Sequence, residues 1–344
     1  MFQPRYTITP KLLANIKRVT ALITELNQKR LSRVVLFDFE RRAREISAHA
    51  STSIEGNPLP LTDVKKILKN MPRHIRDTER EVLNYNKALK YLNGLAEKNK
   101  TALTLPLTLK IHALVMDGLL PKFKVGQLRQ EPVFVNDIRT RQPVYLPPDH
   151  QEVARLMDDL LKFAAPGHRT LDPLIVAGIF HKQFVIVHPF LDGNGRTTRL
   201  ATKVLLASLG LNTFNLFSFE NYYNKNVTKY FQNVGLIGNY YDLKSTIDFT
   251  PWLEYFTDGI IDELLRVGGE LSLAHATPRT ELEPYHRAII AYIKKHGFIR
   301  DRDYAKLTPR ARPTRHLDLR KLIKLDLIKR QGKARGSYYV LKNK

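Results

Sequence analysis

The sequence predicts a mainly α-helical protein with a small β-hairpin and a separate basic domain at its carboxy-terminal end. The first observation is a succession of segments, such as residues 10–30, whose apolar residues recur every three or four positions, the spacing of amphipathic helices. The second is a pair of short β-prone runs, Val133–Val135 and Val144–Leu146, around a polar turn. The third is a final order of three helical segments and two strands, which indicates a winged helix-turn-helix domain.

The amino-terminal region, which we place at residues 1–95, consists of helical segments joined by short turns. The apolar side chains of residues 10–30 recur at steps of three and four, and later segments repeat this periodicity. The second segment stops at Gly56, because glycine accepts the left-handed backbone that ends many helices. The helices expected before the hairpin are residues 10–30, 34–56, 61–70, 76–98 and 105–120.

The segment that leads into the most polar stretch of the chain, residues 174–188, is apolar nearly all around its circumference. A helix of this kind belongs in the centre of a core. Further helices are expected on both sides of it, in residues 149–164, 195–210, 220–235 and 249–269. Together with the hairpin, these helices define a predicted central domain over residues 96–270.

A basic carboxy-terminal domain follows a predicted linker. We place the linker at residues 271–284, directly after Gly268 and Gly269, which suggest the end of a helix. The winged helix-turn-helix domain is placed at residues 285–344. The last 64 residues contain 18 Lys and Arg but only 6 Asp and Glu, so about half of the net charge of +23 lies there. Such a charge favours contact with nucleic acid, nucleotides or acidic partners.

Composition excludes several classes of site and location. The chain has no cysteine, which rules out disulfides and thiolate metal sites. It has no uncharged apolar run of about 18 residues, and its first residues lack the apolar core of a signal peptide. We therefore expect a cytoplasmic protein without a membrane partner.

One stretch, HPFLDGNGRTTR from His188 to Arg199, combines glycines, a carboxylate and two guanidiniums directly after the apolar helix. The glycines permit a tight turn and a close approach of the backbone to a ligand. The first N–H groups of the next helix, together with its dipole, favour an anion. Arg196 and Arg199 are three residues apart and therefore project from one side of that helix. The pair suits a diphosphate or a triphosphate.

Two further side chains of this stretch suit a phosphoryl-type transfer. Asp192 lies just ahead of the arginines, where a carboxylate can hold a divalent metal that bridges phosphates. His188 begins the stretch, and imidazole is the usual general base near neutral pH. Other motifs do not fit, because the chain has no Walker sequence, too few glycines for a dinucleotide fingerprint, and no zinc-site spacing between His181 and His188. We expect His181 to be a packed helical residue.

The same stretch resembles the signature of the Fic family, H-[PF]-F-x-[DE]-G-N-G-R-x-x-R. The resemblance extends from about residue 5 to residue 270. It implies an all-helical Fic fold that transfers AMP from ATP to a hydroxyl group of a target protein, or of the enzyme itself, and releases pyrophosphate. Every fixed position of the signature is matched, by His188, Phe190, Asp192, Gly193, Asn194, Gly195, Arg196 and Arg199.

The resemblance also implies a role for individual residues. His188 would deprotonate the target Ser, Thr or Tyr, and Asp192 would hold Mg²⁺. The strand with Val133, Phe134 and Val135 would belong to a flap that pins a target segment by strand addition. The nucleotide would be bound by the backbone of Gly193–Arg196 with Asn194 as anion hole, by Gly195, by Arg196 and Arg199 on the β- and γ-phosphates, and by Tyr230 and Phe231 near the adenine.

A second stretch, STSIEG from Ser51 to Gly56, resembles the inhibitory motif [ST]-x-x-x-E-[GN] of Fic proteins. Ser51 and Glu55 are four residues apart, so they lie on one face of a helix that Gly56 ends. Its position before the Fic core resembles the subclass with an amino-terminal inhibitory helix. The resemblance implies that Glu55 pairs with Arg199 and restrains the transfer.

Several alternatives remain open from the sequence. The same residues suit removal of AMP from a modified protein, with Glu55 aligning a water molecule. A third hypothesis is a DNA-binding regulator whose Fic domain senses nucleotide, although sensing alone does not need the base His188. The winged helix suits either nucleic acid or protein contact, and the choice between a monomer and a homodimer stays open.

Overall fold

The computed structural model describes residues 2–29, 33–96, 102–137, 140, 142–165, 171–207, 210, 214–274, 282–325, 327–332 and 336–342. The chain divides into two compact units. Unit 1 comprises Met1–Lys29 and Arg42–Gly268, and unit 2 comprises Arg30–Arg41 and Gly269–Lys344.

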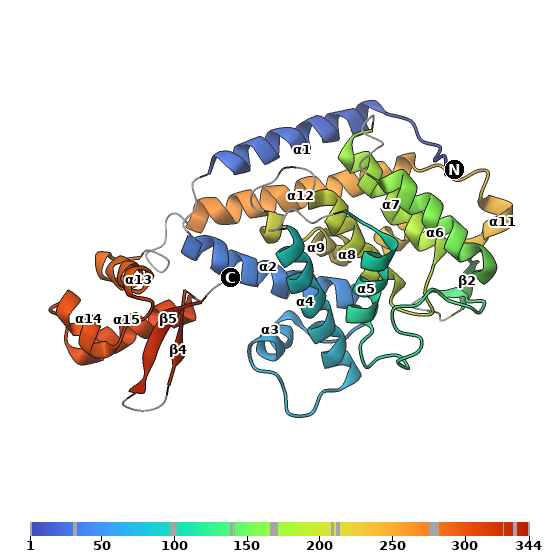
Figure 1. The fold of residues 1–344 in the computed structure, drawn as a ribbon. Coiled ribbons are helices and arrows are strands. Elements are labelled where there is room, and N and C mark those ends of the chain that lie inside the picture. Colours follow the sequence, from blue (N-terminus) through green and yellow to red (C-terminus); the bar gives the residue numbers. More distant parts are fainter. Residues whose placement is uncertain are drawn as a thin grey trace. The chain divides into compact units, whose positions relative to one another are not determined.

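The centre of unit 1 is a group of packed helices (Figure 1). Helix α7 is buried along nearly its whole length, as its uninterrupted apolar sequence predicts. It packs against α6 and α8, and α5 packs against α4 and α8. These helices are α4 (Asp77–Ala96), α5 (Leu105–Val115), α6 (His150–Ala164), α7 (Pro173–Val187) and α8 (Asn194–Leu206).

Two long helices, α1 (Pro10–Gln28) and α12 (Thr250–Ala274), run side by side in unit 1. Polar bonds join them, among them that from Asn15 Nδ2 to Thr257 Oγ1 at 2.9 Å. Helix α12 continues through Gly268 and Gly269 to Ala274, so the linker predicted at residues 271–284 does not begin at residue 271, and residues 275–281 of that prediction lie outside the described residues. A helical glycine costs only about 1 kcal/mol relative to alanine, which a long packed helix absorbs.

The remaining helices of unit 1 are short except for α2, which carries the predicted inhibitory motif. They are α2 (Arg33–Ile54, of which the first part belongs to unit 2), α3 (Leu61–Lys69), η2 (Phe214–Leu216), α9 (Glu220–Lys225), α10 (Val227–Val234) and α11 (Tyr240–Leu243). The single helix expected over 220–235 is therefore two helices. They are separated at Asn226, whose side chain caps the second.

The expected hairpin is part of a three-stranded sheet. Strands β1 (Val135–Asn136) and β2 (Pro143–Leu146) are antiparallel, and β3 (Gly238–Asn239) pairs with β2 in parallel. Of the predicted strand Val133–Val135, only Val135 lies in the sheet, so this prediction is wrong in its bounds. Phe134 precedes the strand and is 61% exposed, which leaves its ring without a core to pack against.

In unit 2, the described residues from 282 onward form three helices followed by two antiparallel strands, the order that the sequence predicts. Its core contains Ile289, Ile293, Tyr304 and Leu319. Asp318 is buried and accepts a hydrogen bond from the Tyr304 hydroxyl at 2.6 Å, which satisfies its charge inside the core. The elements are α13 (Pro284–His296), α14 (Asp301–Leu307), α15 (Arg312–Lys324), β4 (Ile328–Gln331) and β5 (Tyr338–Leu341).

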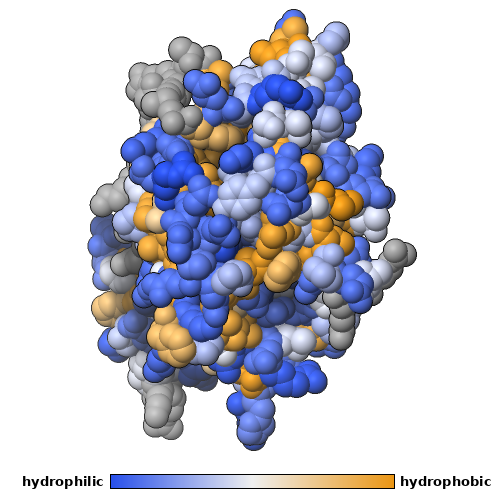
Figure 2. All heavy atoms as spheres, turned by 90° about the vertical axis from the view of Figure 1, so that its right-hand side faces the viewer, coloured by the Kyte–Doolittle hydropathy of each residue, from blue (hydrophilic) through white to orange (hydrophobic). Residues whose placement is uncertain are grey.

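None of the helices that the structure describes has the length and hydropathy that a bilayer crossing requires. On the face shown in Figure 2, hydrophilic residues predominate and hydrophobic residues lie between them in smaller groups. Scattered apolar residues of this kind are normal for protein surfaces.

Candidate active site

The predicted catalytic stretch forms the connection from α7 to α8. His188 ends α7 with a left-handed backbone, φ 49° and ψ 61°, and is the one non-glycine residue with a positive φ in the described part of the chain. Gly193 has φ +75° and directly precedes α8. A side chain at Gly193 would collide with Met116. The turn therefore needs glycine both for its dihedral angles and for space.

Asn194 closes this loop rather than facing a ligand with its side chain. Its Oδ1 accepts a hydrogen bond from the Phe190 N–H at 2.9 Å, and its Nδ2 donates to the Phe190 carbonyl at 2.8 Å. Asn194 is 3% exposed. The side chain of Asn194 thus closes the loop, whereas its backbone N–H belongs to the first turn of α8. The N–H groups of this turn are the groups available to an anion.

His112, which the sequence analysis missed, supports the loop from α5. Its Nδ1 accepts a hydrogen bond from the Gly126 N–H at 2.9 Å, so its proton is on Nε2, which donates to the Asp192 carbonyl at 3.1 Å. Its ring stacks on Phe190 at a centroid distance of 3.8 Å. Burial lowers the pKa of His112 to about 4, which keeps this tautomer neutral.

The imidazole of His188 is also neutral at physiological pH. Burial lowers the pKa of His188 to about 4, against the opposing effect of its contact with the Val185 carbonyl. A neutral imidazole has a lone pair and can accept a proton. His188 is half-buried, so the side chain predicted as general base is in a competent protonation state.

Asp192 is the carboxylate that would hold a metal ion. Its side chain is 59% exposed, and Oδ1 accepts a hydrogen bond from Arg196 Nη2 at 3.3 Å. No group of three or more Asp, Glu or His side chains gathers as a metal site within the described residues. A single carboxylate is the donor set expected for Mg²⁺ that is otherwise held by phosphates and water, so the residues fit this ion.

Arg199 is fully buried and is held by the end of α2. Its Nε donates to Ser51 Oγ at 2.7 Å, and Nη2 donates to the Ser51 carbonyl at 2.8 Å and to Glu55 Oε1 at 2.6 Å. Burial by itself lowers the pKa of Arg199, but the Glu55 carboxylate outweighs it and the pKa is raised. The structure thus brings the two ends of the predicted inhibitory contact together.

The turn after α2 places Glu55 for this contact. The Asn57 N–H donates to the Thr52 carbonyl at 3.1 Å, and the Gly56 N–H donates to the Ser53 carbonyl at 2.9 Å. This pair of bonds is the Schellman motif, which needs a left-handed residue after the helix. Gly56 supplies it with φ +92°, so Glu55 is fixed as the residue that directly follows α2.

The Glu55 carboxylate occupies the space over the first turn of α8. A side chain at Gly195 would collide with Glu55 Oε1 and would lie 3.1 Å from Arg199 Nη1. A carboxylate at a helix N-terminus is in a site that favours anions. Arg199 Nη1 is buried and has no hydrogen-bond partner among the described residues, which leaves a donor free beside this anion site.

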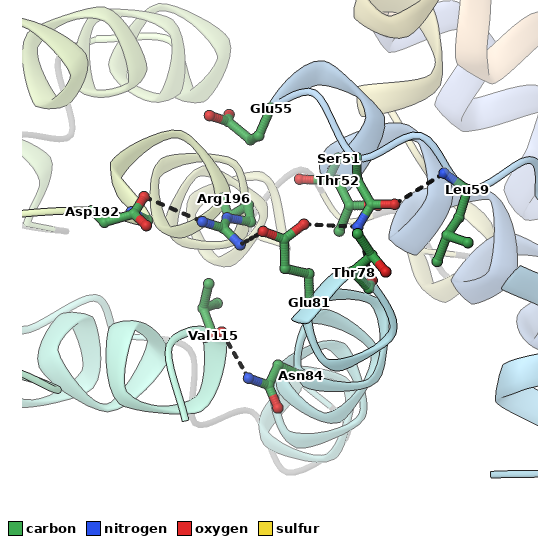
Figure 3. A network of polar contacts seen from close by, with 12 residues as sticks. Ser51, Thr52, Glu55, Leu59, Thr78, Glu81, Asn84, Val115, Asp192 and Arg196 are labelled. Carbon is green, nitrogen blue, oxygen red and sulfur yellow. Dashed lines mark hydrogen bonds and ion pairs between the residues drawn. The ribbon is translucent and has the colours of Figure 1, made fainter. Parts of the chain in front are cut away.

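Arg196 lies between two carboxylates (Figure 3). Its Nη1 is 3.1 Å from Glu81 Oε1 on α4, opposite the contact with Asp192. The Asn57 side-chain amide donates to Glu81 Oε2 at 2.7 Å. Within the described residues, Arg196 Nε and Nη1 are buried without an aligned hydrogen-bond acceptor. Buried donors without acceptors are rare, so this guanidinium also has capacity for an added anion.

The predicted adenine pair is divided by the structure. Tyr230 is 1% exposed, and its hydroxyl lies 3.0 Å from His181 Nε2. Its ring stacks on Tyr223 inside the core. A ring without exposed surface cannot stack on a nucleotide base, so the expectation for Tyr230 is wrong, whereas Phe231 is half-buried and remains a candidate. His181 is packed in the core, as expected.

Arg129 is a further residue that the sequence analysis missed. It precedes the hairpin and is 3% exposed, and its Nε donates to the His188 carbonyl at 2.8 Å. The contact joins residues 59 positions apart, and no local pattern in the sequence signals it.

A mainly helical unit in which a loop and a helix N-terminus present a base and two buried guanidiniums is a candidate phosphate-handling enzyme domain. The profile of the Fic/DOC family matches residues 102–206, which include the whole loop. Over these residues the chain is therefore similar to the Fic/DOC family.

Known relatives share this domain. Protein adenylyltransferase Fic of Drosophila erecta is 29% identical over 226 residues, which cover 59% of this chain and 44% of the relative. Its namesake in Culex quinquefasciatus is 27% identical over 320 residues, which cover 86% of this chain and 59% of the relative. The chain thus spans about half the length of these curated relatives.

Solved structures share the fold. A crystal structure of a Fic family protein from Desulfovibrio desulfuricans G20 superposes with a TM-score of 0.66 at 23% identity and covers 100% of this chain and 99% of that chain. A structure of Fic-1 from C. elegans has a TM-score of 0.61 at 23% identity, over 76% of this chain and 73% of that chain.

Proposed function

We propose that the chain transfers AMP from ATP to a hydroxyl group of a protein and releases pyrophosphate. The observation that carries the proposal is the pair of buried guanidiniums on α8, Arg196 and Arg199, each of which has a buried N–H group without a hydrogen-bond acceptor within the described residues. Buried donors of this kind suit phosphate oxygens. The names of the relatives, protein adenylyltransferase Fic, add support for the reaction.

In the proposed reaction, the target hydroxyl oxygen attacks the α-phosphorus of ATP. A new P–O bond forms, the bond to the β-phosphate oxygen breaks, and pyrophosphate leaves. His188 accepts the proton of the hydroxyl group. Arg196, Arg199 and the first N–H groups of α8 hold and neutralise the phosphate oxygens. Asp192 is the residue that would hold Mg²⁺, which supplies further charge neutralisation for the phosphates.

We also infer that the described state is the restrained one. Glu55 takes the anion site over Gly195 and three hydrogen bonds tie Arg199 to α2. A terminal phosphate placed against Arg199 would meet the Glu55 carboxylate, so ATP could not take the in-line position until this carboxylate moves. Misplacement of this size typically costs about a hundredfold in rate.

The test is incubation of the purified chain with labelled ATP and Mg²⁺, followed by intact mass measurement. The expected result is the gain of one AMP unit on the chain itself or on an added protein, and more of it in the Glu55→Gly variant. A chain that binds ATP but leaves every protein unmodified contradicts the proposal. Loss of AMP from a modified protein would instead favour the reverse activity of the same residues.

For unit 2 we propose contact with nucleic acid. Two of its acidic side chains form ion pairs within the unit, Asp301 with Arg315 and Asp318 with Arg310. The exposed side of α15 carries Arg320 and basic residues near both helix ends. Clustered Lys and Arg along one helix are the electrostatic footprint of phosphate binding.

A further inference from the structure

The backbone of His188 has a left-handed conformation, which a residue with a side chain does not favour. A left-handed residue other than glycine is uncommon, and it persists only where the surrounding structure fixes it. Because this turn sets the direction of the imidazole, whatever fixes the turn also places the proposed base.

Arg129 is the side chain in contact with this turn. Its Nε donates to the His188 carbonyl at 2.8 Å, and its backbone N–H donates to the Pro189 carbonyl at 2.9 Å. Nη2 also reaches the Val187 carbonyl at 3.5 Å. The last carbonyls of a helix have no partners within the helix, and a cation at this end is favourable. Arg129 thus serves the C-terminus of α7 as a charged cap.

The same guanidinium reaches both sides of the hairpin. Nη1 donates to the Glu131 carbonyl, before β1, at 3.3 Å, and Nη2 donates to the Pro148 carbonyl, after β2. A second bond from the hairpin ends on α7, since the Tyr145 hydroxyl donates to the Ile186 carbonyl at 3.1 Å. Both sides of the hairpin are therefore bonded to the turn that carries His188.

The hydrogen bonds of the Arg129 side chain that the structure shows all go to backbone carbonyls. The side chain is 3% exposed, and burial lowers its pKa. Burying a guanidinium is costly unless its donors are used. Here a rigid planar fork reaches several carbonyls at once, a geometry that the single ammonium of lysine cannot reproduce.

We propose that Arg129 is a positioning residue that fixes the backbone of His188 and joins the two sides of the hairpin to it. The proposal rests on the role of His188 in the proposed function. It means that a target segment bound along the hairpin and the base that deprotonates its hydroxyl group are held by one side chain. Arg129 itself does not touch the reacting atoms.

The test compares Arg129→Met and Arg129→Lys in a Glu55→Gly chain, in which transfer is not restrained. The expected result is a fall in kcat of at least about tenfold for Arg129→Met, less for Arg129→Lys, with the Kd for ATP changed less than about threefold, because the phosphate contacts come from other residues. Hydrogen exchange of residues 187–192 is read in the same samples and should quicken in both variants.

Lys182→Met is the matched control, because Lys182 is a buried cation of the same helix whose ammonium donates to the Asn233 carbonyl at 2.7 Å. It should leave kcat and the exchange of residues 187–192 unchanged. Unchanged kcat and exchange in folded Arg129→Met overturns the proposal, as does an ATP affinity that falls in parallel with kcat. If Arg129→Met does not fold, Arg129→Lys decides by the same criteria.

The experiment distinguishes a failure of the proposed function from a failure of the positioning role of Arg129. If the Glu55→Gly parent transfers no AMP, the proposed reaction is wrong, and the exchange measurement alone decides the role of Arg129. If the parent is active and the Arg129 variants match it in rate and exchange, the positioning role is wrong while the reaction stands.

Discussion

Removal of the Glu55 carboxylate is the perturbation whose size the structure defines best. Glu55 Oε1 accepts a hydrogen bond from the buried Arg199 Nη2 at 2.6 Å, and its side chain is 26% exposed. Hydrogen bonds to charged groups contribute roughly 1.5–3 kcal/mol, and the partial exposure of Glu55 favours the lower end. Since about 1.4 kcal/mol corresponds to tenfold in rate, Glu55→Gly should raise AMP transfer by at least about tenfold.

The assay is the initial rate of AMP transfer, self-modification included, at saturating ATP and Mg²⁺. Glu55→Gln is the matched variant, because it keeps the shape and removes the charge, and it should lie between the parent and Glu55→Gly. Arg199→Ala should not mimic Glu55→Gly, because it also loses a phosphate contact. The double variant should be as slow as Arg199→Ala alone, since the two groups act through one interaction. A rate that is unchanged or lower in folded Glu55→Gly refutes the inhibitory role.

Three other predictions follow from the same structure. His188→Ala should lower the rate of transfer about 10²–10⁴-fold and leave the ATP affinity nearly intact; equal rates for the variant and the parent would exclude the base role. Because burial lowers the pKa of His188 to about 4, the neutral base form should persist well below pH 6.5. A methyl group at position 56 would contact no neighbour, but an alanine would have to keep φ +92° at a cost of about 1 kcal/mol. Gly56→Ala should therefore speed transfer several-fold in the parent chain, and it should not raise the rate of the Glu55→Gly variant further. The full chain should bind duplex DNA with an affinity that falls steeply as salt rises, and Arg320→Ala should weaken this binding. Arg315→Ala should instead lower the stability of the protein, because Arg315 pairs with Asp301 at 3.1 Å. If the chain does not bind DNA even at low salt, a protein partner is favoured.

The sequence predicts the kind of site that the predicted catalytic stretch forms, but it does not predict which partner each of its side chains contacts. Two arginines three positions apart predict an anion site because helix geometry alone places them on one side of a helix. Asn194 shows the limit, since its side chain bonds back to Phe190 and a pattern of types does not say which way an amide turns. Tyr230 shows it again, because helical spacing predicts a face and not whether that face is covered.

Contacts between residues far apart in the sequence could not be predicted, for a different reason. Arg129 and His112 lie in segments whose local patterns signal only a loop and a helix, and their partners are 59 and 80 positions away. Glu81 likewise meets Arg196 only after α4 packs near α8. The amphipathic pattern gives each helix its buried face, whereas the partner of a buried polar group depends on the packing of several helices at once.

The two glycines of the loop meet different physical requirements. Gly193 is needed for its left-handed backbone and for the space that Met116 fills. Gly195 is helical, and the space beside it is taken by the Glu55 carboxylate and lies close to the Arg199 guanidinium. On the proposed function, a phosphate of ATP would need the same space, because the N–H groups of α8 and the free donor of Arg199 converge there. Carboxylate and phosphate would thus exclude each other at one position, so a side chain at Gly195 would remove restraint and activity together, whereas a change at Glu55 removes the restraint and leaves the phosphate site intact.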